Sequence, residues 1–193
     1  MKLVVGLGNP GPKYHLNRHN IGFLCLDFWL ESLGVASSRW KSDSQAEHVS
    51  FEFEGQKVVL LKPQTYMNLS GQAVQSTLAF YKIPLQNLVV IHDEIDQPFG
   101  AIKIHKNRGH AGHNGIRSIS QLLGSNDYAR LRLGVGRPAN PEMSVADYVL
   151  QNFSKSEMDS LPAFLERSCD ALEAILQSGV DKAASNFNSK VET

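Results

Sequence analysis

Short apolar runs and amphipathic segments alternate along most of the chain. Ile21, Leu24, Cys25 and Phe28 recur at the spacing of one helix face, whereas residues 58–61 form a continuous apolar run of strand length. Glycine or proline ends many of these segments, as is typical of helix and strand boundaries. The pattern predicts helices over residues 20–33, 70–81, 114–123 and 156–177, a short helix after Gly179, and strands over residues 3–5, 48–53, 58–61, 88–91, 102–105 and 131–135.

The order of these elements predicts the fold class. Strands alternate with helices, and one hairpin interrupts the alternation. We therefore expect an α/β protein, a single three-layer domain over residues 1–193 with a twisted, mixed, mostly parallel sheet flanked by helices. Ligands of such folds bind beyond the carboxyl ends of the strands. Asn9, residues 63–68 and the pair His92 and Asp93 each follow an apolar strand, so we expect them to meet at one edge of the sheet.

The composition narrows the class of protein. Hydrophobic residues make up 42% of the 193 residues and charged residues 20%, the profile of a folded globular protein. No apolar run approaches the roughly 20 residues that span a bilayer, and the first residues lack the features of a signal peptide. Cys25 and Cys169 both fall in apolar helical patterns, which excludes a disulfide framework and a four-cysteine zinc site. We expect a cytoplasmic enzyme or binding protein that does not contact a membrane.

A strongly basic segment lies within a chain of zero net charge. Residues 101–140 carry seven basic side chains and one acidic one, a net charge of +6, whereas residues 141–193 carry four and nine, a net charge of −5. A local excess of this size suits contact with a polyanion. It could equally neutralise the acidic C-terminal helices inside the fold, and charge alone does not separate the two interpretations.

The first strand leads into a glycine-rich turn that contains Asn9. Residues 6–11 match the dinucleotide-binding pattern G-x-G-x-x-G. We reject that interpretation, because the pattern must run directly into a helix that holds the pyrophosphate, and here Pro10, Gly11 and Pro12 delay the helix. The glycines instead allow a sharp turn that aims the Asn9 amide inward, unless Asn9 simply tolerates a left-handed turn conformation.

His19 and Asp93 are candidates for acid–base chemistry. A histidine just before a helix could be a general base, but taken alone it favours a surface helix cap. Asp93 follows a buried strand and could accept the other ring N–H of His19, with Glu94 and Asp96 as alternatives. No G-x-S-x-G turn or other suitable nucleophile lies in these loops. A histidine–aspartate pair alone favours activated water over a covalent intermediate.

Residues 109–115 form a glycine-rich stretch with two histidines. His105, His110 and His113, with Asp93 elsewhere, could in principle bind a metal, but the His-x-x-His spacing is a weak signal and the chain has no His-Glu-x-x-His helix. The backbone N–H groups of such a loop could instead face an anion, beside the neighbouring lysines and arginines. Asn114 is either the cap of the next helix or a ligand of a substrate.

The segment Tyr66-Met67-Asn68-Leu69-Ser70 leads into the second predicted helix. Asn68 could offer a donor and an acceptor to an amide or ester, and Tyr66 could stack on a base or a sugar. Met67 and Leu69 could equally fill the core, with Asn68 as a turn residue. Ser70 fits the cap of the helix that follows.

Taken together, these motifs closely resemble those of the bacterial-type peptidyl-tRNA hydrolase family. They occur in the family's order over roughly residues 3–137. The segments that carry the resemblance are Val5-Gly6-Leu7-Gly8-Asn9-Pro10-Gly11, Tyr14, Arg18-His19-Asn20, Pro63 with Tyr66-Met67-Asn68-Leu69-Ser70-Gly71, His92-Asp93-Glu94, Gly112-His113-Asn114-Gly115 and Arg130-Leu131-Arg132-Leu133-Gly134.

The resemblance implies a monomeric esterase without metal, cofactor or obligate protein partner. Such an enzyme cleaves the bond between a peptide and the 3′ ribose of tRNA, and so recycles prematurely released peptidyl-tRNA. It implies that His19 is the general base, that Asp93 orients it, that Asn9 holds the substrate carbonyl, and that a mobile lid lies around residues 138–152. The further positions are substrate contacts at Tyr14, Tyr66, Met67, Asn68, His113 and Asn114, and tRNA-backbone contacts at Lys103, Lys106, Arg108, Arg130 and Arg132.

One stretch departs from the family pattern. Members usually have a basic residue at the position of His105, within a glycine-rich run, whereas here positive charge is displaced to Lys106 and Arg108. Two rival functions stay open. One is an RNA-binding module in which the histidine–aspartate pair is inactive, and the other is a metal-dependent hydrolase that uses His110 and His113.

Overall fold

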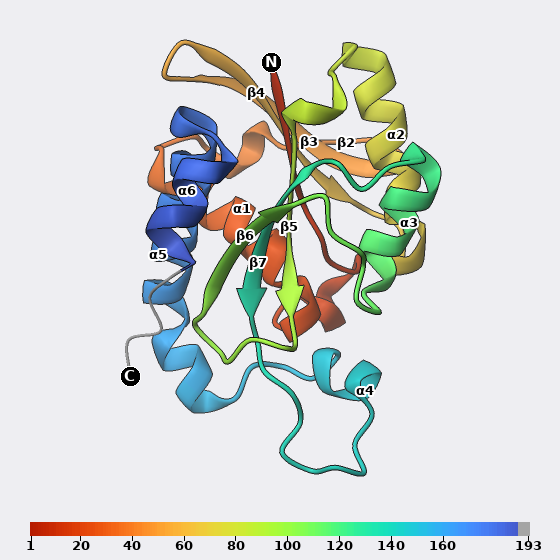
Figure 1. The fold of residues 1–193 in the computed structure, drawn as a ribbon, viewed down its shortest axis with the longest axis vertical. Coiled ribbons are helices and arrows are strands. Elements are labelled where there is room, and N and C mark those ends of the chain that lie inside the picture. Colours follow the sequence, from red (N-terminus) through yellow and green to blue (C-terminus); the bar gives the residue numbers. More distant parts are fainter. Residues whose placement is uncertain (189–193) are drawn as a thin grey trace.

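The sheet has four parallel strands at its centre. Residues 1–188 are described by the computed structural model (Figure 1), and their strands are β1 (Lys2–Gly6), β2 (Lys41–Ser42), β3 (Ala46–Phe53), β4 (Gln56–Pro63), β5 (Leu88–Glu94), β6 (Ile102–Lys106) and β7 (Ala129–Gly134). The strand order is β2-β3-β4-β1-β5-β7-β6. Strands β4, β1, β5 and β7 run parallel, while β2, β3 and β6 pair antiparallel with their neighbours. The carboxyl ends of the parallel strands therefore share one edge.

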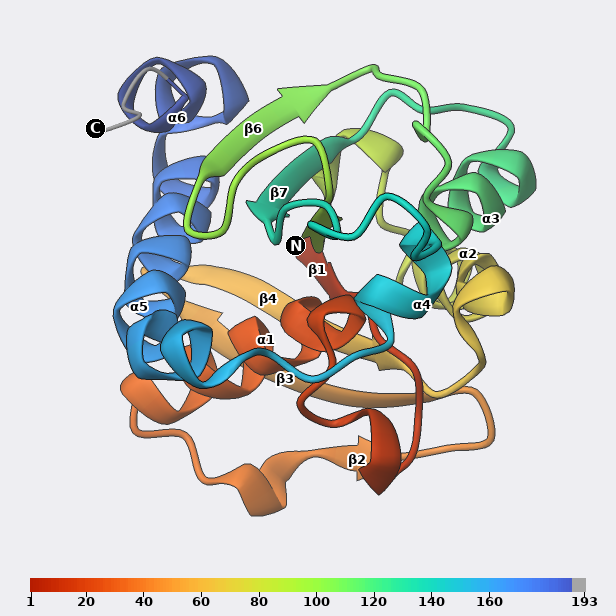
Figure 2. The same ribbon diagram turned by 90° about the horizontal axis from the view of Figure 1, so that it is seen from below.

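Helices cover both faces of this sheet. They are α1 (Ile21–Ser32), α2 (Ser70–Tyr81), α3 (Asn114–Leu123), α4 (Val145–Val149), α5 (Lys155–Ser178) and α6 (Val180–Phe187), with 3-10 turns η1 (Pro12–Tyr14), η2 (Arg18–Asn20), η3 (Ser37–Arg39), η4 (Met67–Leu69) and η5 (Leu85–Asn87). Helices α1, α5 and α6 lie on one face and α2 and α3 on the other, as Figures 1 and 2 show. The short helix α4 lies beyond the carboxyl ends of β5 and β7 (Figure 1).

Each face of the sheet buries its own apolar core. Successive side chains of a strand point to opposite faces, so Leu3 and Val5 of β1 pack with α2 and α3 while Val4 packs with α1 and α5. The strands of the parallel centre therefore read as continuous apolar runs, because both of their faces are covered. The predicted α/β class, with a mixed and mostly parallel sheet flanked by helices, is confirmed.

The predicted elements differ from the structure at a few boundaries. Strand β5 extends through His92, Asp93 and Glu94, which were expected in a loop, because these residues pair with the backbone of β7. Ser70 is the first residue of α2 rather than its cap, since its hydroxyl donates to the Met67 carbonyl at 2.8 Å. The sequence pattern did not predict α4. The single domain over residues 1–193 stays a prediction, and residues 189–193 lie outside the described part of the chain.

Helix α1 lies directly against the ends of β1 and β5. A Cβ atom on Gly22 would overlap the backbone nitrogen of Leu7 and lie 2.5 Å from the carbonyl oxygen of Ile91. One on Gly6 would in turn overlap the Gly22 carbonyl. Backbone atoms cannot give way as a flexible side chain can, so only glycine allows this approach. Because α1 lies this close to the sheet, η2, which directly precedes α1, lies at the carboxyl ends of β1 and β5. None of the helices within residues 1–188 is long and apolar enough to cross a membrane.

We expect Gly22→Ala to destabilise the fold by about 1–3 kcal/mol or more, because the added methyl group has to push α1 away from the sheet. Urea unfolding monitored by circular dichroism measures this change. Gly109→Ala is the matched control, since a Cβ atom there has no neighbour within 4 Å. Equal free energies of unfolding for the two variants would show that α1 is not held by this contact.

Candidate active site

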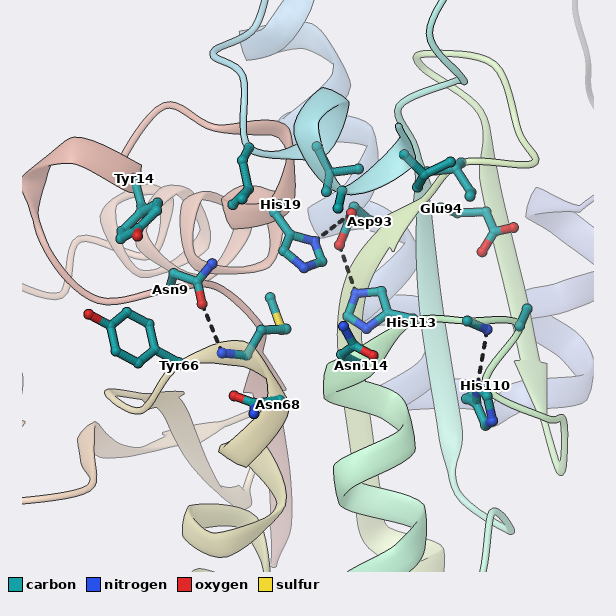
Figure 3. Close-up of a pocket in the computed structure, with 18 of the residues that line it drawn as sticks. Asn9, Tyr14, His19, Tyr66, Asn68, Asp93, Glu94, His110, His113 and Asn114 are labelled. Atoms are coloured by element: carbon teal, nitrogen blue, oxygen red, sulfur yellow. Dashed lines mark hydrogen bonds and ion pairs between the residues drawn. The ribbon is translucent and has the colours of Figure 1, made fainter. Parts of the chain in front are cut away.

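The predicted polar loops meet at the carboxyl edge of the sheet, around a cavity of about 690 Å³. Asn9 follows β1, Tyr66 to Asn68 follow β4, and Asp93 lies near the end of β5. Figure 3 shows these side chains facing one another across the cavity. All nine residues that were predicted to be catalytic or to contact the substrate line it, namely Asn9, Tyr14, His19, Tyr66, Met67, Asn68, Asp93, His113 and Asn114.

His19 reaches this cavity from η2, immediately before α1. Its Nδ1 lies 2.8 Å from Oδ2 of Asp93, a carboxylate that is 3% exposed (Figure 3). An ionised carboxylate only accepts hydrogen bonds, so Nδ1 carries a proton in this pair. In the neutral ring the lone pair is then on Nε2, which is the arrangement that a general base needs.

Asp93 also binds a second histidine. His113 Nε2 donates to the other carboxylate oxygen, Oδ1, at 2.8 Å. The Nδ1 atom of His113 accepts the backbone N–H groups of Gly115 and Ile116, at 3.1 and 3.3 Å, and so caps α3. Helix capping therefore fixes the proton of His113 on Nε2. The alternative that Asn114 caps this helix is wrong, and Asn114 is an exposed residue at the rim of the cavity.

Burial and charge change the pKa values of His19 and Asp93 in opposite directions. Burial alone would lower the pKa of His19, but the Asp93 charge and hydrogen bond outweigh it, so the pKa is raised from its ordinary value. Burial alone would raise the pKa of Asp93, but the two imidazoles hold it well below the ordinary value. Asp93 is therefore ionised at neutral pH. His92 lies edge-on to the His113 ring, with centroids 4.8 Å apart, and burial lowers its pKa, so it stays neutral.

Three hydrogen bonds hold Asn9, one from the Met67 backbone and two with the Asn20 side chain. Its side-chain oxygen accepts the backbone N–H of Met67 at 2.8 Å. Asn20 clamps its backbone, because Asn20 Oδ1 accepts the Asn9 N–H and Asn20 Nδ2 donates to the Asn9 carbonyl, both at 2.9 Å. Since its amide oxygen is bound, the Asn9 amino group is the part of the side chain that faces a ligand. The turn therefore presents a fixed donor to the cavity.

The remaining lining residues differ in exposure. Tyr66 is 62% exposed, and Asn68 is also an exposed residue, so both offer polar or aromatic surface to a large ligand. Met67 is buried, and its sulfur lies 3.8 Å from the Ser70 hydroxyl, so it forms the cavity floor. Tyr14, from η1, is half-buried and also lines the cavity.

The two alternative carboxylates have other partners. Glu94 forms an ion pair with Arg132 at 2.9 Å, and Asp96 binds Arg137 at 2.7 Å. Asp93 is thus the carboxylate that binds His19. These ion pairs also bear on the basic segment, because within residues 1–188 none of its ion pairs reaches α5 or α6. The interpretation that this segment neutralises the C-terminal helices is therefore supported by no ion pair among these residues, and the one contact of this kind is Lys103 with the carbonyl of Asn188 at the end of α6.

Strands β6 and β7 carry a basic face beside the cavity, made of Lys103, His105, Arg130 and Arg132. The register places His105 opposite Arg130 and Lys103 opposite Arg132, so the four side chains share one face of the sheet. Burial and the neighbouring positive charges of Arg108, Arg132, Arg130 and Lys103 lower the pKa of His105 to about 4. A histidine with that pKa is neutral at pH 7, and the neighbouring cations add to the effect of burial.

The five residues that were predicted to contact the tRNA backbone differ in their exposure and in their partners within the protein. Arg130 is 3% exposed, and its guanidinium donates to the Gly109 carbonyl at 2.9 Å, so it supports the loop before His113. The Lys103 ammonium donates to the carbonyl of Asn188, and Arg132 is engaged by Glu94. Lys106 and Arg108 are exposed. Among these five residues, the positive charge that a phosphate can reach directly therefore concentrates at the end of β6. That end lies beside the amino end of β7, away from the carboxyl edge that carries the cavity.

The histidine and aspartate side chains of this cluster are of the kinds that bind metal ions. Among residues 1–188, His19, Asp93 and His113 are the histidine, cysteine or acidic residues whose ligand atoms come within 4.8 Å of one another. Two of these nitrogens already donate to Asp93, and His113 has its other nitrogen bound to α3. His110 does not belong to this group, because its Nδ1 accepts the Gly112 N–H. Both ring nitrogens of His113 are therefore engaged, which argues against the metal alternative that paired His110 with His113.

Sequence reasoning missed several residues of the site. The sequence analysis assigned no structural role to Asn20 and did not identify His113 as a helix cap. It also assigned no role to the α4 residues that line the cavity, which are Val145, Ala146 and Val149. The start of α4 carries a usable signal, because Ser144 caps it by accepting the Asp147 N–H in a Ser-x-x-Asp pattern. The role of Asn20 depends on a contact between two turns and leaves no local pattern.

Comparison with known proteins places the chain. The family model described as peptidyl-tRNA hydrolase matches residues 3–193. The peptidyl-tRNA hydrolase of Bdellovibrio bacteriovorus is 57% identical over 97% of this chain and 100% of that protein, and that of Citrifermentans bemidjiense is 49% identical over 98% of both. The crystal structure of peptidyl-tRNA hydrolase from Acinetobacter baumannii superposes with a TM-score of 0.88 at 33% identity, covering 98% of this chain and 95% of that one. The chain belongs to the peptidyl-tRNA hydrolase family and is an enzyme that releases the peptide from peptidyl-tRNA.

Proposed function

We propose that the enzyme cleaves the ester between peptide and tRNA with a water molecule activated by His19. The single observation that carries this proposal is the 2.8 Å contact between His19 Nδ1 and Asp93, which leaves Nε2 as the basic nitrogen. Nε2 takes a proton from the water molecule while the water oxygen attacks the ester carbonyl carbon. The bond between that carbon and the ribose oxygen then breaks, and the ribose oxygen receives the proton. The products are a peptide with a free carboxyl group and a tRNA with a free hydroxyl.

Asn9 and its neighbours supply the electrostatic part of this reaction. Its bound oxygen aims the amino group at the cavity, so it donates to the carbonyl oxygen, which becomes negative during attack. The donor is already held in place by Asn20 and Met67, so no reorganisation is needed when charge develops. Asn68 and Asn114 offer further amides at the rim to orient the blocked amino group of the peptide. Tyr14 and Tyr66 stack on the terminal nucleotide.

The basic face explains how a small enzyme engages a tRNA. Phosphate contacts supply sequence-independent affinity, which suits a substrate class that includes every peptidyl-tRNA released prematurely. Lys106 and Arg108 make the direct phosphate contacts, because they are the exposed cations among the five predicted positions. Lys103 and Arg132 add to the positive potential, and Arg130 holds the loop through Gly109. A mobile lid around residues 138–152, a cytoplasmic location, a monomeric state and the absence of a metal or cofactor stay predictions.

We expect His19→Ala to lower the rate of hydrolysis of N-acetyl-aminoacyl-tRNA by about 10²–10⁴-fold or more, while folding and tRNA binding stay near the parent values. The reason is that the other basic groups that line the cavity already have partners within residues 1–188. His113 donates to Asp93, Glu94 is paired with Arg132, and Nδ1 of His110 accepts the Gly112 N–H. Steady-state assays with and without EDTA measure this, and insensitivity to EDTA is expected. Activity within tenfold of the parent would disprove the role of His19.

Asp93→Asn should lower the rate and move the acidic limb of the pH–rate profile to lower pH. The Asp93 charge raises the pKa of His19, so its removal lets burial lower that pKa, and the ring loses its proton at a lower pH. Rates measured across the acidic range on one blocked substrate test this. An unmoved acidic limb would mean that another group sets the pKa of the base.

Replacing Lys106 and Arg108 together by alanine should raise KM for full-length peptidyl-tRNA and flatten its salt dependence by about two phosphate contacts. The rate on a minimal ester that lacks the tRNA body should not change, because His19 and Asn9 are untouched. Arg39→Ala with Lys41→Ala is the matched control, since it removes one arginine and one lysine from the opposite edge of the sheet. An equal rise in KM for the control would show that net charge, not a local contact, is responsible.

A further inference from the structure

Arg18 is a buried guanidinium next to His19 that the proposed reaction does not use. Its side chain is only 8% exposed. Nη2 donates to Glu157 Oε1 at 2.7 Å, Nη1 donates to the Tyr148 carbonyl at 3.2 Å, and the Tyr148 ring centroid lies 4.1 Å from Cζ. A side chain with this much desolvated charge needs all of these contacts, because burying an unpaired guanidinium is costly.

The partners of Arg18 belong to the segment that includes α4 and the start of α5. The backbone follows the same path, since the Arg18 N–H donates to the Gln151 carbonyl and the Phe153 N–H donates to the Leu16 carbonyl, both at 3.1 Å. Asn17 adds a side-chain hydrogen bond to Asn152 at 2.7 Å. Residues 16–18 are therefore joined to residues 148–157 over their whole length.

Both ends of this connection are anchored. Glu157 belongs to a capping box, in which its carboxylate accepts the Ser154 N–H at 2.8 Å while the Ser154 hydroxyl accepts the Glu157 N–H. The Tyr148 hydroxyl donates to the Val135 carbonyl, just after β7, at 2.8 Å. The Arg18 guanidinium thus bridges the long helix α5 and the helix α4, which is itself tied to the end of the sheet.

Helix α4 covers the catalytic cavity. Val145, Ala146 and Val149 line the same cavity as His19 and Asp93. Figure 2 shows α4 lying across the end of the sheet beside the start of α1. One peptide bond separates Arg18, which holds α4, from His19, which α4 covers. A shift of α4 therefore pulls directly on the turn that places the His19 ring.

We propose that Arg18 is a positioning residue that couples the position of α4 to the His19–Asp93 pair, so that the base is correctly placed only when α4 covers the cavity. This proposal rests on the role of His19 as the base. The turn η2 has no side-chain cap of its own, and the contacts of Arg18 and Asn17 with residues 148–157 take that place. A lysine cannot replace this guanidinium, because one ammonium cannot bond the carboxylate and the carbonyl while stacking on the ring.

Arg18→Lys should therefore lower kcat by about 10–100-fold with little change in KM, since a misplacement of about 1 Å in a reacting group has an effect of that size. The acidic limb of the pH–rate profile should move to lower pH, because a loosened His19–Asp93 bond no longer raises the pKa of His19. Asp93 and His113 are the titratable groups that contact the His19 ring. Glu94, His110 and Arg137 also line the cavity and are unchanged in the variant.

Arg167→Lys is the matched control. Arg167 also donates to a backbone carbonyl, that of Gly100 at 2.9 Å, and lies over an aromatic ring, that of Phe164, but it joins α5 to the loop before β6. We expect parent values of kcat, KM and the acidic limb for this variant. Glu157→Gln, which keeps the shape of the capping box but removes the charge that holds Arg18, should change the same quantities as Arg18→Lys in the same direction if the latter does not fold.

A double-mutant cycle with Asp93→Asn decides the mechanism. If Arg18 acts through the His19–Asp93 pair, Arg18→Lys has little further effect on kcat or the acidic limb in the Asp93→Asn background. Additive effects, or parent kcat and acidic limb together with a lower melting temperature, would mean that Arg18 only stabilises the fold and would overturn the proposal. His19→Ala serves as the reference, because a nearly active His19→Ala enzyme disproves the base and the coupling together. An inactive one beside an unaffected Arg18→Lys enzyme disproves the coupling alone.

Discussion

The Asp93 carboxylate is the charge around which the rest of the site is built. Removing a carboxylate from water costs several kcal/mol unless its oxygens are fully hydrogen-bonded. Here each oxygen accepts one imidazole N–H at 2.8 Å, from His19 on one side and His113 on the other. His113 is itself fixed by the first turn of α3, whose positive dipole end lies nearby. The strand end, the α3 cap and the α1 turn must all be in place for this charge to be tolerated.

That requirement explains why the close approach of α1 matters for chemistry as well as for stability. Gly22 lets η2 lie at the carboxyl ends of β1 and β5, and η2 carries His19. A helix held one side chain farther away would leave Asp93 with an unpaired oxygen. The same charge therefore selects for tight packing between α1 and the sheet, so the site and the core are not independent parts of the fold.

The sequence predicts the parts of this arrangement that depend on chain order. The alternation of strands and helices, with the rule for parallel strand ends, brings Asn9, residues 63–68 and Asp93 together before any coordinates are known. It does not predict what depends on contacts between distant segments. His113 caps α3 in place of Asn114, and Arg130 in a basic segment is buried against Gly109. Neither follows from local pattern, because a cap and a buried guanidinium look like any other histidine or arginine until their neighbours are placed.

The charge state that stabilises the cluster is not the one that catalysis needs. Because Asp93 raises the pKa of His19 above its ordinary value of 6.5, protonated His19 stabilises the fold fully below that value. This contribution is lost as the pH rises through the raised pKa, which is where His19 becomes a base. The lowered pKa of Asp93 acts at the other end, since its contribution is present above the ordinary value of 3.8 and is lost below it. In the active state the geometry therefore has to be kept by contacts that do not titrate. The Asn9–Asn20 clamp and the bond from the Met67 N–H to the Asn9 side-chain oxygen are contacts of that kind, which accounts for a site whose supports are mostly neutral amides around one buried charge.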